Sequence, residues 1–211
     1  MLGADFRHVN AGQFRKIIEK SAYFGLPTVL LLAILAFPSV SLFLNFGTGA
    51  FLLLTVVTFV KPLSVLLPFR FLKILMTYRR EMGVSTFWLY VAHSVGLFSL
   101  GAFTPDDIFV FQRNIFWGWL AGMGLTIMAL TSNDRSMQLL KRNWKRLHRI
   151  VYVLYFLVLY HYSLAENGYG KLIVFGGIFI ILKFCEFHQP TRKILQQLLN
   201  RVLTKRVSAQ H

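Results

Sequence analysis

The chain has 211 residues, of which 55% are hydrophobic and 16% aromatic, and its formal net charge is +15. Its mean hydropathy of +0.56 and its long uncharged runs exclude a single soluble domain, because buried core helices rarely contain apolar runs of this length. The positive charge is typical of nucleic-acid-binding proteins, but here the basic residues lie between apolar runs. That placement favours a membrane protein that contacts lipid and no nucleic acid.

Six apolar runs follow one another along the chain, and we expect each to cross the bilayer as a helix. They cover residues 21–44, 48–67, 84–103, 115–131, 150–165 and 172–187. Pro27 is expected to kink the first helix. The second run contains Lys61 and Pro62 near its end, and the sixth contains Lys183 and Glu186. The runs predict an all-α integral membrane protein, a six-helix bundle that forms a single domain over residues 1–211.

The placement of the basic residues predicts the topology. Twenty-one of the 23 Lys and Arg residues lie before the first run, at the end of the second run and in the connection after it, in the fourth connection, or at the end of the sixth run and beyond it. The other two, Arg113 and Lys171, fall in connections that also carry acidic residues. Because cytoplasmic loops are enriched in basic residues, we expect both termini in the cytoplasm.

The two ends of the chain are therefore expected on the inner side of the membrane. Residues 1–20 are predicted to form a cytoplasmic N-terminus that stays attached, since the first apolar run is longer than the core of a signal peptide. Residues 189–211 place apolar residues beside basic ones, as in an amphipathic helix that lies on the inner leaflet. Cys185 is the single cysteine, which excludes covalent haem attachment through a Cys-x-x-Cys-His motif. Any haem must therefore be of the b type.

Three histidines, His93, His148 and His161, lie in or at the edge of these apolar runs. An unpaired polar ring is costly there, so each ring needs a partner. His148 and His161 are thirteen residues apart on one run, a rise of roughly 20 Å in a helix. The pair can therefore reach two sites at different membrane depths, and two stacked haems would fit.

Helices three and five run in the same direction if six spans alternate, so residues at equal distance from their cytoplasmic ends can meet. His93 lies fourteen residues beyond Arg79, which places it level with His161 and places Arg79 level with His148. We therefore predict a bis-histidine b-haem between helices three and five, held by His93 and His161. A second haem would have His148 and no second histidine, and Arg79 can hold a propionate there with its planar guanidinium.

Helical phase supports half of this arrangement. Arg79 and His93 share a helix face, whereas His148 and His161 would lie about 140° apart on an ideal helix. Either the fifth helix is bent, or His148 precedes its regular body. Other readings stay open, because membrane histidines also form interhelical hydrogen bonds, and three histidines can bind zinc or copper, although no carboxylate or cysteine accompanies them within the membrane. Aromatic candidates for the wall of a porphyrin site are Trp88, Tyr90, Trp117 and Trp119.

Four stretches carry a family resemblance. They read FGTGAFLLLTVVTFVKPL, RREMG followed by the histidine of LYVAHS, ALTS, and KRNWKRLHRIVYVLYFLVLYHY. Over about residues 47 to 162 they resemble the ferric-reductase-like transmembrane family, and within it the haem-binding membrane subunits of bacterial periplasmic methionine sulfoxide reductase systems. The resemblance implies a bacterial inner-membrane location, one or two b-haems at His93, His148 and His161, and Arg79 where eukaryotic relatives carry a further histidine. It also implies FMN, for which no local motif is present.

The expected function is that of an electron conduit. Neither a Gly-x-Gly-x-x-Gly nor a Walker loop occurs, and about two dozen residues follow the sixth run, too few for an FAD and nicotinamide domain. Electrons would come from a cytoplasmic flavin reductase or the quinol pool. By the resemblance they would pass to a periplasmic molybdenum-dependent methionine sulfoxide reductase subunit, so the chain would not be catalytically complete alone. The alternatives are another haem-dependent electron carrier, such as a ferric reductase component, and a non-haem membrane anchor or transporter.

Overall fold

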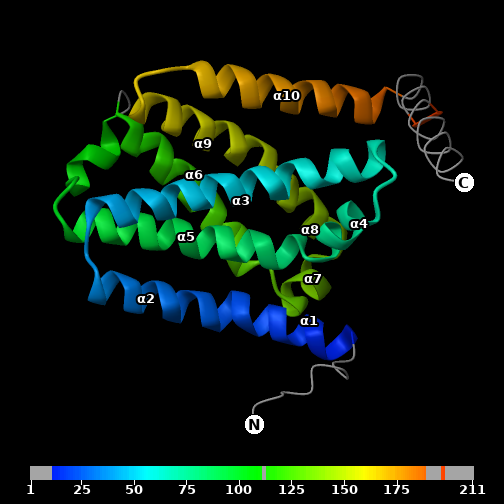
Figure 1. The fold of residues 1–211 in the computed structure, drawn as a ribbon, viewed down its shortest axis with the longest axis horizontal. Coiled ribbons are helices and arrows are strands. Elements are labelled where there is room, and N and C mark those ends of the chain that lie inside the picture. The colour runs from blue at the N-terminus through cyan, green and yellow to red at the C-terminus, as the bar shows by residue number, and fades with distance from the viewer. Residues whose placement is uncertain (1–10, 111–112, 189–195, 198–211) are drawn as a thin grey trace, which may run out of the picture.

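The computed structural model describes residues 11–110, 113–188 and 196–197, and within this part every regular element is helical. The long helices lie side by side along the molecule (Figure 1). They are α2 (Leu26–Ala36), α3 (Val40–Leu66), α5 (Arg79–Ser99), α6 (Asn114–Leu130), α9 (Val151–Ala165) and α10 (Gly170–Phe187). Shorter elements join them, namely α1 (Ala11–Lys20), the π-helical turn η2 (Ser21–Gly25), α4 (Arg70–Thr77), the 3-10 turn η3 (Pro105–Phe109), α7 (Asp134–Leu140), α8 (Arg142–Leu147) and the 3-10 turn η4 (His148–Ile150).

The first connection lies earlier than the hydropathy pattern predicts. α2 ends at Ala36 and α3 begins at Val40, so the predicted limits of the first span at residue 44 and of the second at residue 48 are wrong. Pro38 lacks the N–H that a helix needs, and the Ser39 side chain caps α3 by accepting the Leu42 N–H at 3.2 Å. The residues on both sides of this turn are apolar, so the hydropathy pattern shows no break between the two helices.

The N-terminal helices form one long stretch with an irregular turn in the middle. α1 continues through η2 into α2, and Pro27 lies in the first turn of α2. A π-helical turn widens the helix by one residue and is a common cause of bending. The irregularity therefore lies directly before the proline at which a kink is expected.

Three helical stretches are long and apolar enough to cross a membrane: Gly12–Ala36, Val40–Leu66 and Arg142–Ala165. α6 and α7 together would make a fourth, but the two helices meet at an angle of 92°. This chain is therefore a multi-pass membrane protein.

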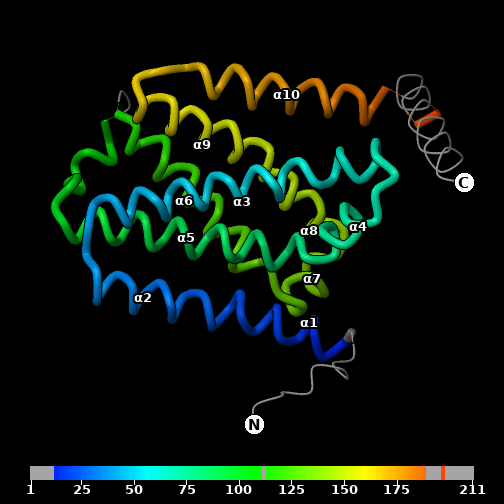
Figure 2. Tube along the Cα trace, in the orientation of Figure 1, coloured from blue at the N-terminus to red at the C-terminus, as the bar shows by residue number. Residues whose placement is uncertain are grey.

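Four of the long helices surround the centre of the molecule. α3 packs along α5, α6 packs along α9, and the contacts of α5 with α6 and of α3 with α9 close the ring. α5 and α9 are thus diagonal partners. α2 lies outside against α5, and α10 lies outside against α9 and α3 (Figure 2).

The core between α3, α9 and α10 is aromatic. Tyr155 of α9 is fully buried, and its ring lies 6.5 Å from Phe51, 5.7 Å from Phe59 and 5.6 Å from Phe179, measured between ring centroids. Aromatic pairs at such separations contribute about 0.5–1.5 kcal/mol each beyond the area that they bury. This cluster fixes α9, which carries His161 and directly follows the turn that contains His148.

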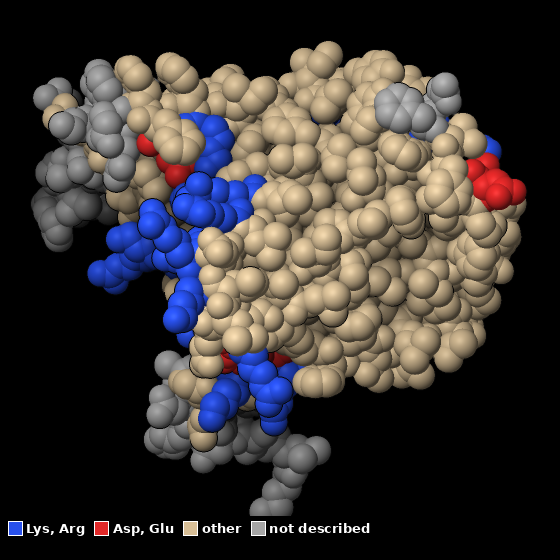
Figure 3. All heavy atoms as spheres, turned by 180° about the vertical axis from the view of Figure 1, so that it is seen from behind, with Lys and Arg blue, Asp and Glu red and all other residues tan. Residues whose placement is uncertain are grey.

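Charged side chains gather at the two ends of the bundle (Figure 3). The end built from α1, α4, α7 and α8 is here called the basic end; it carries Arg15, Lys16, Lys20, Arg70, Lys73, Arg79, Arg80, Arg135, Lys141, Arg142, Lys145 and Arg146. At the opposite end the described part of the chain has Arg113 and Lys171, which pair with Asp107 and Glu166. The predicted amphipathic tail lies outside the described residues except for 196–197, where Gln196 donates to the Val65 carbonyl at 2.8 Å.

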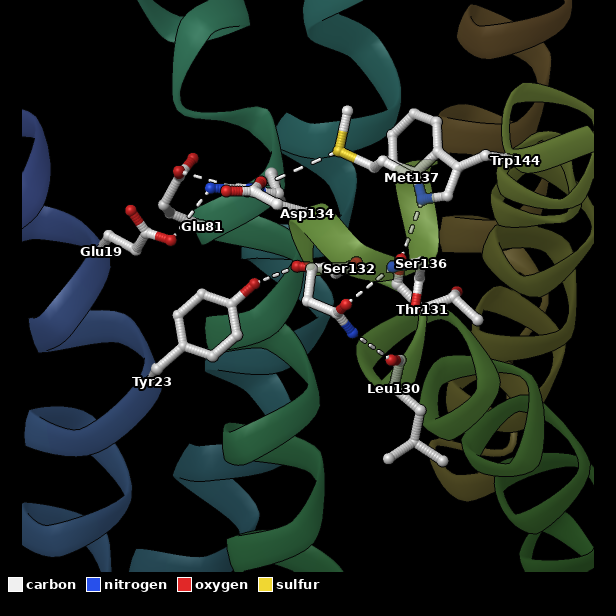
Figure 4. A network of polar contacts seen from close by, with 12 residues as sticks. Glu19, Tyr23, Glu81, Leu130, Thr131, Ser132, Asp134, Ser136, Met137 and Trp144 are labelled. Carbon is white, nitrogen blue, oxygen red and sulfur yellow. Dashed lines mark hydrogen bonds and ion pairs between the residues drawn. The ribbon is translucent and has the colours of Figure 1, made fainter. Parts of the chain in front are cut away.

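An arginine at the start of α5 ties three elements together at the basic end. Arg80 pairs with Asp134 of α7 at 2.5 Å, with Glu19 of α1 at 3.1 Å and with its neighbour Glu81 at 3.5 Å. Beside it the Tyr23 hydroxyl donates to the Ser132 carbonyl (Figure 4). These contacts hold the N-terminal helix against the turn that follows α6.

Candidate functional site

The imidazole rings of His93 and His161 lie next to each other at the centre of the four helices α3, α5, α6 and α9. His93 projects from α5 and His161 from α9, and their ring centroids lie 6.5 Å apart with the planes inclined at 77°. The predicted meeting of these two residues across parallel helices is confirmed. Because α5 and α9 are diagonal, the rings meet across a space that the backbones leave open.

Each ring is anchored by one nitrogen to a neighbouring helix. His93 Nδ1 lies 2.8 Å from the Phe43 carbonyl of α3, and His161 Nδ1 lies 2.7 Å from the Asn114 carbonyl of α6. A carbonyl oxygen can only accept, so Nδ1 carries the hydrogen in both rings. Nε2 then keeps its lone pair, which is the arrangement that metal-ligating histidines show.

A glycine lies beside each anchored ring. A Cβ added to Gly47 of α3 would lie 2.7 Å from His93 Nδ1, and one added to Gly118 of α6 would lie 2.8 Å from His161 Nδ1. Real Cβ atoms do not approach other atoms so closely. The two histidines therefore rest directly on the backbone of the neighbouring helices.

The two rings line a cavity of about 420 Å³, within the usual range for cofactor and ligand pockets of about 300–1,000 Å³. Its lining is mainly apolar: Leu44, Gly47, Thr48, Ala50, Phe51, Leu54, Thr86, Tyr90, His93, Ser94, Leu97, Phe103, Ile108, Asn114, Ile115, Gly118, Trp119, Ala121, Leu125, Val158, His161, Tyr162, Ala165 and Glu166. Of the aromatic candidates, Tyr90 and Trp119 belong to this lining, whereas Trp88 and Trp117 do not. The loop residues among the lining come from the end opposite the basic end.

A small charged cluster borders the cavity at that opposite end. Lys171 donates to Glu166 at 2.6 Å and to the Tyr162 hydroxyl at 2.9 Å, and its ammonium lies 4.2 Å from the centre of the Tyr162 ring. The hydrogen bond from Lys171 lowers the pKa of the Glu166 carboxyl below its ordinary value. The Glu166 carboxylate therefore lines the cavity as an anion that is paired with the Lys171 ammonium.

His148 and Arg79 lie at the basic end, outside this cavity. His148 Nε2 lies 3.2 Å from the Thr131 hydroxyl, and its ring stacks on Trp144 with the centroids 4.1 Å apart. Arg79 donates through Nε to the Val57 carbonyl at 2.9 Å. Arg79 and His148 share no described hydrogen bond, but they lie close enough for the Arg79 charge to act on the His148 ring. His148 opens the 3-10 turn η4 before α9, so it does precede the regular body of the helix.

The sequence pattern identifies the ring partners but not their supports. Gly47 and Gly118 lie against the two rings at positions that histidine spacing gives no reason to select, and the Phe43 and Asn114 carbonyls are backbone atoms. The signal that favours such positions is a small residue in an apolar helix, where two helices approach closely. Among the described residues, no group of three or more His, Cys, Asp or Glu side chains is arranged to hold a metal ion. The ring of His188 stacks on Phe184.

The family described as the ferric reductase like transmembrane component matches residues 46–159, which include Arg79, His93 and His148 and end shortly before His161. The protein-methionine-sulfoxide reductase heme-binding subunit MsrQ of Xanthomonas campestris pv. campestris is 29% identical over 120 residues, 52% of this chain and 52% of that protein. MsrQ of Xanthomonas oryzae pv. oryzae is 28% identical over the same shares.

A third relative has a different name. The magnetosome protein MamZ of Magnetospirillum gryphiswaldense is 32% identical over 127 residues, 56% of this chain and 19% of that protein. The chain thus spans about half the length of the MsrQ relatives and about one fifth of MamZ. No solved structure matches the chain. Because the family match takes in more than half of the chain, this protein belongs to the ferric reductase like transmembrane family.

Proposed function

We propose that this protein is a b-type membrane cytochrome that passes electrons across a bacterial inner membrane. The observation that carries the proposal is the pair His93 and His161, whose rings face each other across a cavity with both Nδ1 atoms tied to carbonyls. These two neutral imidazoles would hold a haem iron through their Nε2 lone pairs. Haem bound there would supply one-electron redox chemistry.

The separation of the rings fits one metal ion between them. Imidazole nitrogen bonds to a metal ion such as zinc at about 2 Å, and the ring centre lies about 1 Å behind that nitrogen, so two rings on opposite sides of one ion have centres about 6 Å apart. The observed centroid distance is 6.5 Å. The apolar lining would provide the low-dielectric surroundings that tune a haem potential.

A second haem is proposed at the basic end, where His148 would bind the iron and Arg79 would bind a propionate. His148 lies on the same helical stretch as His161, a rise of roughly 20 Å away. To bind iron, His148 Nε2 would have to give up its hydrogen bond with the Thr131 hydroxyl. The Arg79 guanidinium donates one hydrogen bond to the Val57 carbonyl. Its planar set of N–H donors matches the geometry of a carboxylate such as a haem propionate.

The proposed direction of transfer follows from the charges. If α2, α3, α5, α6, α9 and α10 all cross the membrane within one domain, the basic end faces the cytoplasm with both termini. The cavity of His93 and His161 would then lie in the periplasmic half. Electrons would arrive from a flavin reductase or quinol, with FMN as a further cofactor, and leave to a periplasmic methionine sulfoxide reductase subunit. The MsrQ relatives, which are protein-methionine-sulfoxide reductase heme-binding subunits, support this partner.

The first test is the visible spectrum of the purified full chain. A Soret band with resolved alpha and beta bands on reduction identifies low-spin b-haem. His93→Ala and His161→Ala should each remove the same haem component. His188→Ala is the matched control, because His188 stacks on Phe184 away from the cavity, and it should keep the wild-type spectrum.

Two results would contradict the proposal. A wild-type protein without haem would assign the histidines to interhelical hydrogen bonding in a membrane anchor. Full haem content with an unchanged spectrum in both single variants would show that His93 and His161 are not the ligand pair.

A further inference from the structure

The two histidines are held by the same backbone arrangement on two different helices. On α3 the accepting carbonyl is Phe43 and the glycine beside the ring is Gly47; on α6 they are Asn114 and Gly118. In both helices the carbonyl and the glycine are four residues apart, one turn along the same face. The repetition on separate helix pairs, α3 with α5 and α6 with α9, indicates a shared physical requirement.

The requirement follows from helix geometry. In an α-helix the carbonyl of residue i accepts the N–H of residue i+4, so each histidine adds a second donor to a carbonyl that already bonds the glycine N–H. Any side chain on residue i+4 would project over this carbonyl. Only glycine leaves the oxygen open to a ring that arrives from the side, and the Cβ distances of 2.7 Å at Gly47 and 2.8 Å at Gly118 measure how completely the ring fills that space.

We propose that Gly47 and Gly118 are positioning residues that fix the plane and the tautomer of the two haem-ligating histidines. This inference rests on the proposed haem-binding function. With glycine present, Nδ1–H reaches the carbonyl and the ring planes stay near the observed 77°. A methyl group on either glycine would push its ring away from the helix, lengthen the Nδ1–H···O=C bond, and free Nδ1 and Nε2 to exchange roles as proton carrier.

The test compares two pairs of alanine variants in the full-length, haem-loaded protein. Gly47→Ala and Gly118→Ala put a Cβ against a ligand ring. Gly49→Ala on the same helix α3 meets only Leu89, with 3.7 Å between Cβ and Cδ1, an ordinary contact. Gly124→Ala on the same helix α6 overlaps Leu154 of α9, so it disturbs the α6–α9 interface without touching His161.

The readouts are haem content, the midpoint potential, and the EPR signal of the ferric protein, whose anisotropy depends on the angle between the two imidazole planes. We expect Gly47→Ala and Gly118→Ala to weaken haem binding about tenfold or more, as loss of a metal ligand's hydrogen-bond partner does. They should also move the EPR signal and the potential. Gly49→Ala should match wild type, and Gly124→Ala should lower the yield of folded protein while its folded fraction keeps the wild-type signal.

Three results would overturn the proposal. The first is wild-type EPR and potential in both Gly47→Ala and Gly118→Ala. The second is the same spectral change in Gly124→Ala, which would assign the effect to general packing. The third is loss of all folded protein in both ring-facing variants, which would make the two glycines helix-packing residues only. A wild-type protein without haem, in contrast, would reject the proposed function itself, so the two failures are distinguishable.

Discussion

The ring of Phe43 on α3 lies against the backbone of Gly96 on α5, where any Cβ would overlap it. The same two helices also make the reciprocal contact, in which the His93 ring of α5 lies against Gly47 of α3. Each helix thus offers a glycine to an aromatic ring of the other. Small residues let helix backbones approach closely in a membrane, where no hydrophobic effect drives helices together. This interlocking explains why α3 and α5 form a firm support for one side of the histidine cavity.

The first prediction concerns Arg79 at the proposed second site. Arg79→Lys keeps the positive charge but loses the planar fork, and with it the geometry of the Nε bond to the Val57 carbonyl. We expect weaker retention or a shifted midpoint potential of the haem component that does not depend on His93. Arg70→Lys on α4, at the same end, is the control. A redox titration that matches wild type would argue against any haem role for Arg79.

The second prediction concerns the buried charges around Arg80. The Glu81 side chain is only 3% exposed, and removing Arg80 would leave its carboxylate unpaired. Breaking a buried pair in this way costs about 3–5 kcal/mol, so Arg80→Met should markedly lower the midpoint of thermal unfolding in detergent. The double variant Arg80→Met with Glu81→Gln should recover part of the loss. Equal stability of the single and double variants would show that Glu81 is not the group left unpaired.

The third prediction is a pH dependence at the opposite end. The pKa of the Asp107 carboxyl is lowered, chiefly by the Thr104 N–H that donates to it at 2.8 Å, and further by Arg113. A carboxyl with a lowered folded-state pKa stabilises the fold above its unfolded pKa of about 3.9, and this contribution is lost as the pH falls through the folded-state pKa. Wild type should therefore unfold at a higher temperature than Asp107→Asn near neutral pH.

That difference should shrink when the same melts are repeated at about pH 3, below the reference pKa of about 3.9. Asp106→Asn serves as the control, because it alters the neighbouring carboxylate. If the gap between wild type and Asp107→Asn stayed constant over this range, the capping carboxylate would have no part in stabilising the turn η3.

The fourth prediction concerns the direction of electron transfer. In vesicles of known orientation, reduced flavin or a flavin reductase on the basic side should reduce the haems, and an acceptor on the other side should reoxidise them. The rate with an acidic reductase should fall as salt rises, because the basic end would attract it electrostatically. NADH or NADPH alone should have no effect. Oxidation of either nucleotide by the isolated chain would refute the proposed electron-conduit function. Reduction of the haems only from the opposite side would refute it as well.

The nature of the acceptor separates the two electron-carrier readings. Reoxidation by a periplasmic methionine sulfoxide reductase subunit would support the proposed partnership. Reoxidation by ferric chelates alone would favour a ferric reductase component instead. The same vesicles serve for both measurements.

Hydropathy and histidine spacing alone were enough to predict an all-helical membrane protein and the meeting of His93 with His161. Both depend on distances along single helices, since a rise of about 1.5 Å per residue sets the depth of every side chain. The concentration of basic residues at one end likewise follows from the order of the apolar runs. Predictions of this kind need no knowledge of how helices pack.

Hydropathy could not predict the turn at Pro38 and Ser39, because apolar residues continue on both sides of it. Only the local backbone geometry shows that α2 ends at Ala36 and that α3 begins at Val40. The position of His148 against Thr131 and Trp144 was also not predictable. It depends on how the turn after α6 folds back onto the start of α9.

The places of Gly47 and Gly118 against the two histidine rings were decided by tertiary structure alone. A glycine in an apolar helix has no side chain whose chemistry could suggest a function, and the Phe43 and Asn114 carbonyls look like any other peptide groups in the sequence. Their importance arises when a ring from another helix reaches the same backbone turn. Depth within a membrane is a property of one helix, whereas the orientation of a ligand ring is a property of two helices in contact, and only their packing sets it.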